Sequence, residues 1–389
     1  MKSLFLGRGK VNSSIAQFLS EDHFLDEASG ISFDEVDWKN YLPAKVFVSP
    51  GIDPRRPFFK KISTYEVKEL DFFCEHFKKP IIAITGTDGK STLTTQLGEV
   101  LRRALPQKKI FIGGNLGTPM FEAFKENFDI AVLEISSFQA ERLKTADLHS
   151  AILINLASDH LDRYDSLEDY YGAKWHLLSK AKQVFFPTNL SKTPKNLKNK
   201  AAYKNEDSLL DILKNIVSVL AQDFQFEVRE KLFEDLPKLP HRLQAFRENV
   251  GRRVFVNDSK ATTVHATLYA LQQLHQKYRG VFLILGGKSK GESFRPLLKE
   301  LKSEDKLFIV GEARDILMEQ TAAFAGSRSI FLSLSDLLQS LLPELPPDTC
   351  LILSPACSSY DEFENFEERG DFFLQKVRER FSIEETELV

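Results

Sequence analysis

The sequence is poor in cysteine, has no long hydrophobic run and carries little net charge, and each of these excludes a class of protein. Only three of its 389 residues are cysteines, and no two form a CxxC pair. This argues against a disulfide scaffold or a zinc knuckle, and it suits a reducing cytoplasm. No apolar run approaches the roughly 20 residues that cross a bilayer, and the first residues lack a signal-peptide core. The 52 basic and 55 acidic residues nearly cancel, so charge gives no reason to expect a nucleic-acid or membrane partner.

The composition and the order of the hydrophobic runs predict a folded α/β chain. Hydrophobic residues make up 42% of the sequence, which is enough for ordinary cores. Short apolar runs alternate with amphipathic stretches, as is typical of parallel sheets flanked by helices. The expected strands are 4–6, 81–85, 130–135, 151–155, 254–257, 281–285, 307–310 and 351–353, and the expected helices are 90–103, 262–277, 294–301 and 362–378. The segment 189–207, rich in lysine and asparagine, predicts a surface loop.

Two proline-containing runs suggest domain boundaries. The run Lys-Lys-Pro at 78–80 precedes a new strand, and the run 236–240, with two prolines, precedes another strand-rich region. They predict a small N-terminal domain over 1–78, a central nucleotide-type domain over 79–239 and a C-terminal α/β domain over 240–389. Ligands of open α/β sheets bind at the carboxyl ends of strands, so the polar residues that follow each strand are the candidates for chemistry.

A strand, a glycine-containing turn and a helix meet at 81–92, where the sequence reads IIAITGTDGKST. Backbone amides in such a turn can surround phosphate oxygens. Lys90 would reach the outer phosphates, and Ser91 or Thr92 would hold Mg²⁺. The strict P-loop pattern has glycine where Ile84 stands, and an incidental turn is the alternative, but the strand–turn–helix context favours phosphate binding. The residues expected around the phosphates are Gly86, Thr87, Asp88, Gly89, Lys90, Ser91 and Thr92.

Polar residues near other strand ends predict a magnesium site beside this loop. Glu134 lies near the end of the expected strand 130–135, His160 follows the expected strand 151–155, and a second glycine-rich loop at 113–119 contains Asn115. One such residue alone is more often structural, but several at the edge where the phosphate loop emerges favour a Mg²⁺–nucleotide site. The run 7–12 is weaker, because Asn12 replaces the third glycine of a dinucleotide fingerprint and a tight turn explains it equally well.

The C-terminal third has four strand ends followed by hydroxyl and cationic residues, at 240–242, 256–262, 285–291 and 353–361. Lysine and arginine in such places suit carboxylates and phosphates. A solvated loop charge is the alternative for each, but four in one domain favour a binding face. Lys174, by contrast, is by its pattern alone an ordinary helix lysine that faces solvent.

Taken together, these segments resemble the Mur ligase family, the ATP-dependent amide ligases of peptidoglycan precursor synthesis. The residues that carry the resemblance occur in the family's order, at 85–92, 113–117, 134–139, 155–163, 174, 241–242 and 257–262. The runs 48–52 and 354–370 are similar to the type that adds D-glutamate to UDP-N-acetylmuramoyl-L-alanine. The resemblance implies a Rossmann-like N-terminal domain for UDP, a P-loop-type central domain for ATP and a Rossmann-like C-terminal domain for the amino acid, in a cytoplasmic monomer.

The resemblance also implies roles for individual residues. Lys90, Asn115, His160 and Lys174 would take part in catalysis, and Lys174 would carry a CO₂-derived carbamate. The implied contacts are Ser91, Glu134, His160 and Lys174 for two Mg²⁺ ions; Arg242 and Asp258 for ATP, besides the phosphate loop; Lys260, Thr262, Lys290, Ser359 and Phe366 for D-glutamate; and Lys10, Val11 and Asp26 for UDP.

The implied reaction forms an acyl phosphate from ATP and the L-alanine carboxylate, which the amine of D-glutamate then attacks. Three features depart from the family pattern: Asp88 replaces an asparagine, Lys288 replaces an aspartate, and the His-Asn motif that contacts adenine is missing. Two alternatives follow. One is a related Mur or folylpolyglutamate-type ligase with a different acceptor, and the other is a non-catalytic nucleotide-binding homologue.

Overall fold

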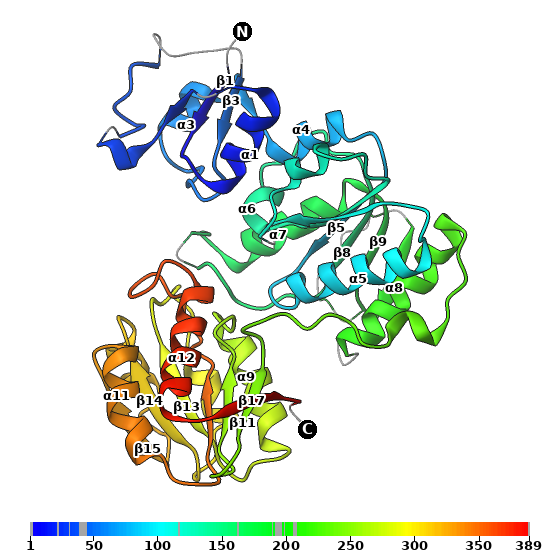
Figure 1. The fold of residues 1–389 in the computed structure, drawn as a ribbon. Helices are drawn as coiled ribbons and strands as arrows, with labels where there is room; N and C mark the ends of the chain where they lie inside the picture. The colour runs from blue at the N-terminus through cyan, green and yellow to red at the C-terminus, as the bar shows by residue number, and fades with distance from the viewer. Residues whose placement is uncertain are drawn as a thin grey trace. The chain divides into compact units, whose positions relative to one another are not determined.

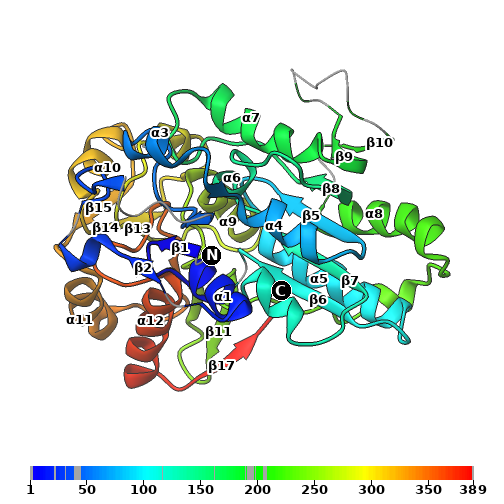
Figure 2. The same ribbon diagram turned by 90° about the horizontal axis from the view of Figure 1, so that it is seen from above.

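The structure is a computed structural model that describes residues 3–21, 23–30, 32–38, 45–115, 117–161, 163–188, 190, 197, 199–204 and 208–387. Its strands form three sheets accompanied by helices (Figures 1 and 2). Contacts divide the chain into two compact units. The first joins Met1–Leu156 to Ser166–Pro237, and the second joins Ala157–Asp165 to Lys238–Val389.

The N-terminal sheet is parallel, with the strand order β2-β1-β3-β4. Its strands are β1 (Ser3–Leu6), β2 (Phe24–Leu25), β3 (Lys45–Val48) and β4 (Glu66–Val67), and its helices are α1 (Lys10–Leu19), α3 (Phe58–Ile62) and α4 (Glu69–His76). Successive side chains of a strand point to opposite faces. Leu4 and Leu6 therefore pack in one core, while Phe5 and Phe47, which are paired across β1 and β3, face another.

The core that receives Phe5 and Phe47 continues into the central sheet. It also contains Leu133 of the central sheet, and the ring of Phe18 in α1 packs at a tilt against that of Phe124, with ring centroids 4.5 Å apart. The chain has 32 phenylalanines, and their rings supply large apolar area at such junctions. A continuous core explains why the first two sheets fall in one compact unit.

The central sheet is also parallel, with the order β10-β9-β8-β5-β7-β6. Its strands are β5 (Ile81–Thr85), β6 (Ile110–Gly114), β7 (Ile130–Glu134), β8 (Leu148–Leu153), β9 (Ala181–Pro187) and β10 (Lys200–Tyr203). Its helices are α5 (Lys90–Ala104), α6 (Ser137–Ala140), α7 (Leu167–Leu178) and α8 (Leu209–Phe224). Figure 1 shows α5 and α8 along one face of the sheet, and they share one hydrophobic core. Because helices cover both faces, β5 is buried along its whole length.

The C-terminal sheet has the order β15-β14-β13-β16-β12-β11-β17, and it is parallel except for β11, which runs antiparallel to both neighbours. Its strands are β11 (Gln244–Glu248), β12 (Val254–Asn257), β13 (Phe282–Gly286), β14 (Lys306–Val310), β15 (Ser327–Ile330), β16 (Cys350–Leu353) and β17 (Ile383–Thr386). Its α-helices are α9 (Val264–His275), α10 (Arg314–Gln320), α11 (Leu334–Glu344) and α12 (Phe366–Arg380). Short 3₁₀ helices complete the described chain at Glu27–Ser29, Met120–Phe124, Glu230–Phe233 and Arg295–Lys299.

The prediction of an α/β chain with parallel sheets is confirmed, and every strand expected from the sequence is present within a few residues. The prediction that 189–207 is a surface loop is wrong at its end, because β10 pairs with β9 and buries Tyr203; most of the segment lies outside the described residues. The helix expected over 294–301 is the short 3₁₀ turn that contains Pro296. Among the described residues, no helix is long and apolar enough to span a bilayer.

Candidate functional site

The phosphate-loop sequence forms a tight turn between β5 and α5. Gly89 is the N-cap of α5 with φ = 80°, in the left-handed region that glycine adopts without strain. Lys90 and Ser91 therefore open a helix of 15 residues whose first amide groups point out of its N-terminus. Such a terminus, at the carboxyl edge of a buried parallel strand, favours an anion.

Asn155, just beyond the end of β8, fastens this turn from the neighbouring strand. Its Oδ1 accepts hydrogen bonds from the backbone amides of Thr87 at 3.0 Å and Asp88 at 2.9 Å. Its Nδ2 donates to the carbonyl of Asp88 at 3.2 Å. The conformation of the loop thus depends on a side chain that the sequence analysis placed in a strand but gave no role.

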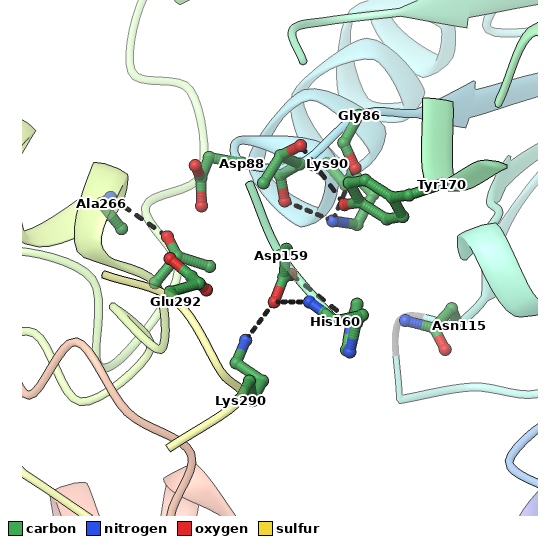
Figure 3. A network of polar contacts seen from close by, with 12 residues as sticks. Gly86, Asp88, Lys90, Asn115, Asp159, His160, Tyr170, Ala266, Lys290 and Glu292 are labelled. Atoms are coloured by element: carbon green, nitrogen blue, oxygen red, sulfur yellow. Dashed lines mark hydrogen bonds and ion pairs between the residues drawn. The ribbon is translucent and has the colours of Figure 1, made fainter. Parts of the chain in front are cut away.

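The two candidate lysines of this unit meet at one carbonyl oxygen. Lys90 Nζ donates to the carbonyls of Gly86 at 3.0 Å and Thr87 at 2.6 Å, and Figure 3 shows it turned back beside Gly86. Lys174 Nζ donates to the same Gly86 oxygen at 2.8 Å. Two ammonium groups on one acceptor repel each other, so this arrangement gains stability if an anion joins them or if one lysine loses its charge.

Lys174 is buried, and the reading of its pattern as a solvent-facing lysine is wrong. Its relative exposure is 1%, and its ammonium lies 4.3 Å from the centre of the Tyr170 ring, one turn earlier on α7. The Tyr170 hydroxyl lies 3.3 Å from Thr87 Oγ1. The face of α7 that carries both residues packs on the phosphate loop, which local sequence pattern did not reveal.

Glu134 forms a buried polar group with Ser91 and Asn115. Its side chain is held at 2% exposure, where Oε2 accepts from Ser91 Oγ at 2.6 Å and Oε1 accepts from Asn115 Nδ2 at 2.8 Å. Gly114 makes the approach possible, because a Cβ there would lie 2.3 Å from the Glu134 carbonyl oxygen. Both partner side chains are uncharged, and a buried carboxylate with neutral partners favours a nearby cation.

His160 belongs to the short segment that contacts place with the second unit. It has φ = 55°, which is uncommon for a side chain with a Cβ. Its backbone amide donates to Asp159 Oδ1 at 2.9 Å, and its Nε2 lies 3.4 Å from Asp159 Oδ2. Among the described residues, no group of three or more His, Cys, Asp or Glu side chains forms a cluster that could hold a metal. Ser91 and Glu134 alone are too few for a metal ion, so a site there would need further ligands.

In the C-terminal unit, Lys260 and Phe366 form a stacked pair, with the ammonium 3.9 Å from the ring centre. Thr262 follows Lys260 in the same turn, where its amide donates to the Lys260 carbonyl at 2.8 Å. Ser359 is 2% exposed in the loop after β16. Lys290, in the loop after β13, forms an ion pair with Asp159.

Arg369 links the loop after β12 to the loop after β16. Its guanidinium donates to Ser259 Oγ and to the carbonyls of Ser259, Ser358 and Cys357, at distances from 2.8 to 3.2 Å. Burial lowers the pKa of Arg369 to about 10, so it stays charged at neutral pH. Arg369 lies in the run 354–370 that carries the resemblance, but no role for it follows from the sequence.

Arg242 and Asp258 differ in how they are placed. The Asp258 carboxylate accepts from the Leu243 amide at 3.1 Å and from Ser354 Oγ at 2.7 Å. It therefore fixes the residue that follows Arg242. The Nε of Arg242 is buried and has no hydrogen-bond partner within the described residues.

The expected uridine residues lie at one edge of the N-terminal sheet. Asp26 follows β2, and its Oδ2 accepts from the Arg8 amide at 2.9 Å. Lys10 and Val11 begin α1 at the end of the neighbouring strand. Asn12, which replaces the third glycine, donates to the carbonyls of Leu6 at 2.8 Å, Gly7 at 2.9 Å and Phe47 at 3.4 Å, so its side chain holds the turn.

Comparison with known proteins gives matches over most of the chain. Residues 84–234 match the profile of the Mur ligase middle domain, and residues 241–357 match that of the Mur ligase glutamate ligase domain. The UDP-N-acetylmuramoylalanine–D-glutamate ligase of Francisella philomiragia is 30% identical over 408 residues, which cover 97% of each chain. The protein of the same name from Aquifex aeolicus is 32% identical over 414 residues, covering 97% of this chain and 98% of its own.

Solved structures support the same fold at lower identity. UDP-N-acetylmuramate-alanine ligase MurC from Thermotoga maritima has a TM-score of 0.62 and 17% identity, over 97% of this chain and 99% of its own. MurF ligase from the same organism, solved with ADP, has a TM-score of 0.58 and 15% identity, over 97% and 95%. At these identities the likeness concerns the fold alone.

Proposed function

We propose that this chain, which belongs to the Mur ligase family, uses ATP to join D-glutamate to UDP-N-acetylmuramoyl-L-alanine in peptidoglycan precursor synthesis. The observation that carries the proposal is the near full-length similarity to two ligases whose names state these two substrates. In this proposal the chain has three domains: the N-terminal domain binds UDP, the central domain binds ATP and the C-terminal domain binds the amino acid.

The reaction needs activation, because a carboxylate is a poor electrophile. An oxygen of the L-alanine carboxylate attacks the γ-phosphorus of ATP, the bond to the bridging oxygen breaks, and ADP leaves. The neutral amine of D-glutamate then attacks the acyl carbon of the resulting acyl phosphate. Inorganic phosphate leaves as the amide forms, and the amine gives up a proton. The protein's contribution is to position the reactants and to stabilise charge.

At the nucleotide end, the phosphate loop from Gly86 to Thr92 surrounds the phosphates. Lys90 already lies over the loop, held by two carbonyl oxygens. A phosphate oxygen is a stronger acceptor for an ammonium than a carbonyl is, so the lysine would exchange these partners for the β- and γ-phosphates. The charge it supplies lowers the repulsion between the anionic carboxylate and ATP.

The residues around Glu134 fit a magnesium ion. Ser91 and Glu134 offer hard oxygen ligands within 2.6 Å of each other, and Mg²⁺ prefers such ligands. Bound there, the ion would neutralise phosphate charge during transfer. Asn115, which holds Glu134, would also face the reacting carboxylate. His160 and a carbamate on Lys174 complete the proposed ligands for two ions. Carbamylation would replace one of the two ammonium groups at the Gly86 oxygen by an anion, which supports this assignment.

At the amino-acid end, D-glutamate presents two carboxylates and a short apolar chain. Lys260 and Lys290 supply cations, Thr262 and Ser359 supply hydroxyls, and Phe366 supplies an apolar face. Arg242 would contact the nucleotide, and Asp258 would act by fixing the backbone beside it. Lys10, Val11 and Asp26 would receive UDP at the edge of the N-terminal sheet. The enzyme would act as a monomer in the cytoplasm.

A product assay with a panel of amino acids tests this proposal. The protein is incubated with UDP-N-acetylmuramoyl-L-alanine, ATP, Mg²⁺ and one amino acid at a time, and the masses of the products are measured by mass spectrometry. We expect a gain of one glutamyl residue with D-glutamate and not with L-glutamate. A product with a different amino acid would indicate a related ligase, and nucleotide binding without any product would indicate a non-catalytic homologue.

A further inference from the structure

We infer that Asp159 is a displaceable counter-ion for Lys290, which a carboxylate of the incoming amino acid must replace. This inference rests on the proposed function, because it assumes that Lys290 receives D-glutamate. It assigns to Asp159 a positioning role that controls how tightly the amino acid binds.

The ion pair is short and well shielded. Lys290 Nζ lies 2.5 Å from Asp159 Oδ1, and the two side chains are only 11% and 8% exposed. Both residues belong to the second compact unit, although 131 positions separate them. Figure 3 shows the Lys290 side chain reaching Asp159 beside His160.

Asp159 also shapes the turn that carries His160. The same Oδ1 atom that faces Lys290 accepts from the backbone amide of His160 at 2.9 Å. This bond supports a residue with a positive φ. The carboxylate therefore acts locally and at a distance: Oδ1 accepts the hydrogen bond of the His160 amide, Oδ2 lies 3.4 Å from His160 Nε2, and its charge holds the ammonium of Lys290.

The charge of Asp159 must oppose the binding of a second carboxylate at Lys290. Two carboxylates compete for one ammonium, and solvent screens these charges poorly at such low exposures. The arriving carboxylate thus replaces Asp159 rather than adding to it. The affinity for D-glutamate is lower by the free energy of the ion pair that it breaks, while Lys290 is kept in place when the amino acid is absent.

The test replaces Asp159 by asparagine, which removes the charge but keeps an oxygen for the His160 amide. D-Glutamate is titrated by calorimetry into protein saturated with UDP-N-acetylmuramoyl-L-alanine and a non-hydrolysable ATP analogue, so that no turnover is needed. We expect Asp159→Asn to lower the Kd for D-glutamate about fivefold, the effect of one ion pair of moderate strength. Glu248→Gln is the matched control, because Glu248 pairs with Arg253 at a similar exposure in the same unit; its Kd should equal that of the wild type.

A double variant shows whether Asp159 acts through Lys290. In a Lys290→Ala background, Asp159→Asn should leave the Kd unchanged, whereas a purely structural role would persist. Unchanged or weaker binding of D-glutamate by Asp159→Asn alone would overturn the inference. An equal fall in Kd on adding Asp159→Asn to the Lys290→Ala background would overturn it too. If D-glutamate binds the wild type but the variants do not show the expected Kd values, the inference fails and the proposed function stands. If D-glutamate does not bind the wild type, both fail.

Discussion

Replacing Lys174 by alanine probes the least obvious element of the proposed site. The lysine is buried on α7, donates to the Gly86 carbonyl at 2.8 Å and packs on the Tyr170 ring. If it carries a carbamate that binds Mg²⁺, its loss removes a metal ligand. We therefore predict that Lys174→Ala is almost inactive, with turnover lower by about a thousandfold, or about 4 kcal/mol in the activation barrier.

Loss of stability cannot account for a change of this size. A hydrogen bond from a charged group contributes about 1.5–3 kcal/mol, and the desolvation of a buried ammonium offsets part of that. A net loss of about 2 kcal/mol would lower the melting temperature by roughly 4–8 °C in a unit of this size. The variant should thus remain folded at the assay temperature, and a thermal melt checks this.

Three assays of phosphate release separate the carbamate from other roles. Lys174→Gln keeps a polar side chain with an N–H donor but cannot be carbamylated, so it should be as inactive as the alanine variant. Acetate should partly restore Lys174→Ala by filling the place of the missing carboxylate group. Wild-type enzyme depleted of CO₂ should lose activity and regain it with bicarbonate. Lys214→Ala, a change at a half-exposed lysine of the same unit, is the control. Near-normal turnover in Lys174→Ala would refute the reasoning.

Three further predictions concern other parts of the chain. Lys90→Ala should nearly abolish ligation while the protein stays folded, because Lys90 is partly exposed and the two hydrogen bonds of its ammonium go to carbonyls of the loop itself; a variant that keeps most of its activity would contradict the phosphate-loop assignment. Arg242→Ala should raise the KM for ATP several-fold more than the KM for D-glutamate, and steady-state kinetics that show the reverse would reassign this arginine. Burial raises the pKa of Glu69 to about 7, so the folded state binds a proton that the unfolded state releases near pH 4.5. Stability from this group is therefore lost as the pH rises toward 7, by roughly 3 kcal/mol. Melting temperatures of Glu69→Gln should exceed those of the wild type increasingly from about pH 5 to about pH 8, and a constant difference would refute this.

The parts of the molecule that the sequence predicted well are those with local signals. A strand, a glycine turn and a lysine that opens a helix are neighbours in the chain, so β5, the phosphate loop and α5 could be read directly. The alternation of apolar runs and amphipathic stretches likewise located eight of the described strands, at least one in each sheet. Such patterns depend on periodicity and turn chemistry over a few residues.

The parts that could not be predicted depend on contacts between distant residues. The sequence pattern around Lys174 is that of a surface lysine, because Gly86, whose carbonyl oxygen accepts its hydrogen bond, lies 88 positions away. The Asp159–Lys290 pair spans 131 positions, and Arg369 binds Ser259 across 110. Only the meeting of loops at the sheet edges brings these groups together, and no local pattern encodes it. The strand β10 was missed because its four residues lie in a polar segment.

The most direct test of the proposed reaction follows an oxygen atom. UDP-N-acetylmuramoyl-L-alanine is prepared with heavy oxygen in the alanine carboxylate and incubated with ATP, Mg²⁺ and D-glutamate, and the released phosphate is examined by mass spectrometry. Activation through an acyl phosphate transfers one heavy oxygen to each phosphate, in step with formation of the D-glutamyl product. Phosphate without the label, or labelled phosphate whose release does not depend on D-glutamate, would contradict the proposal that ATP activates this carboxylate for attack by D-glutamate.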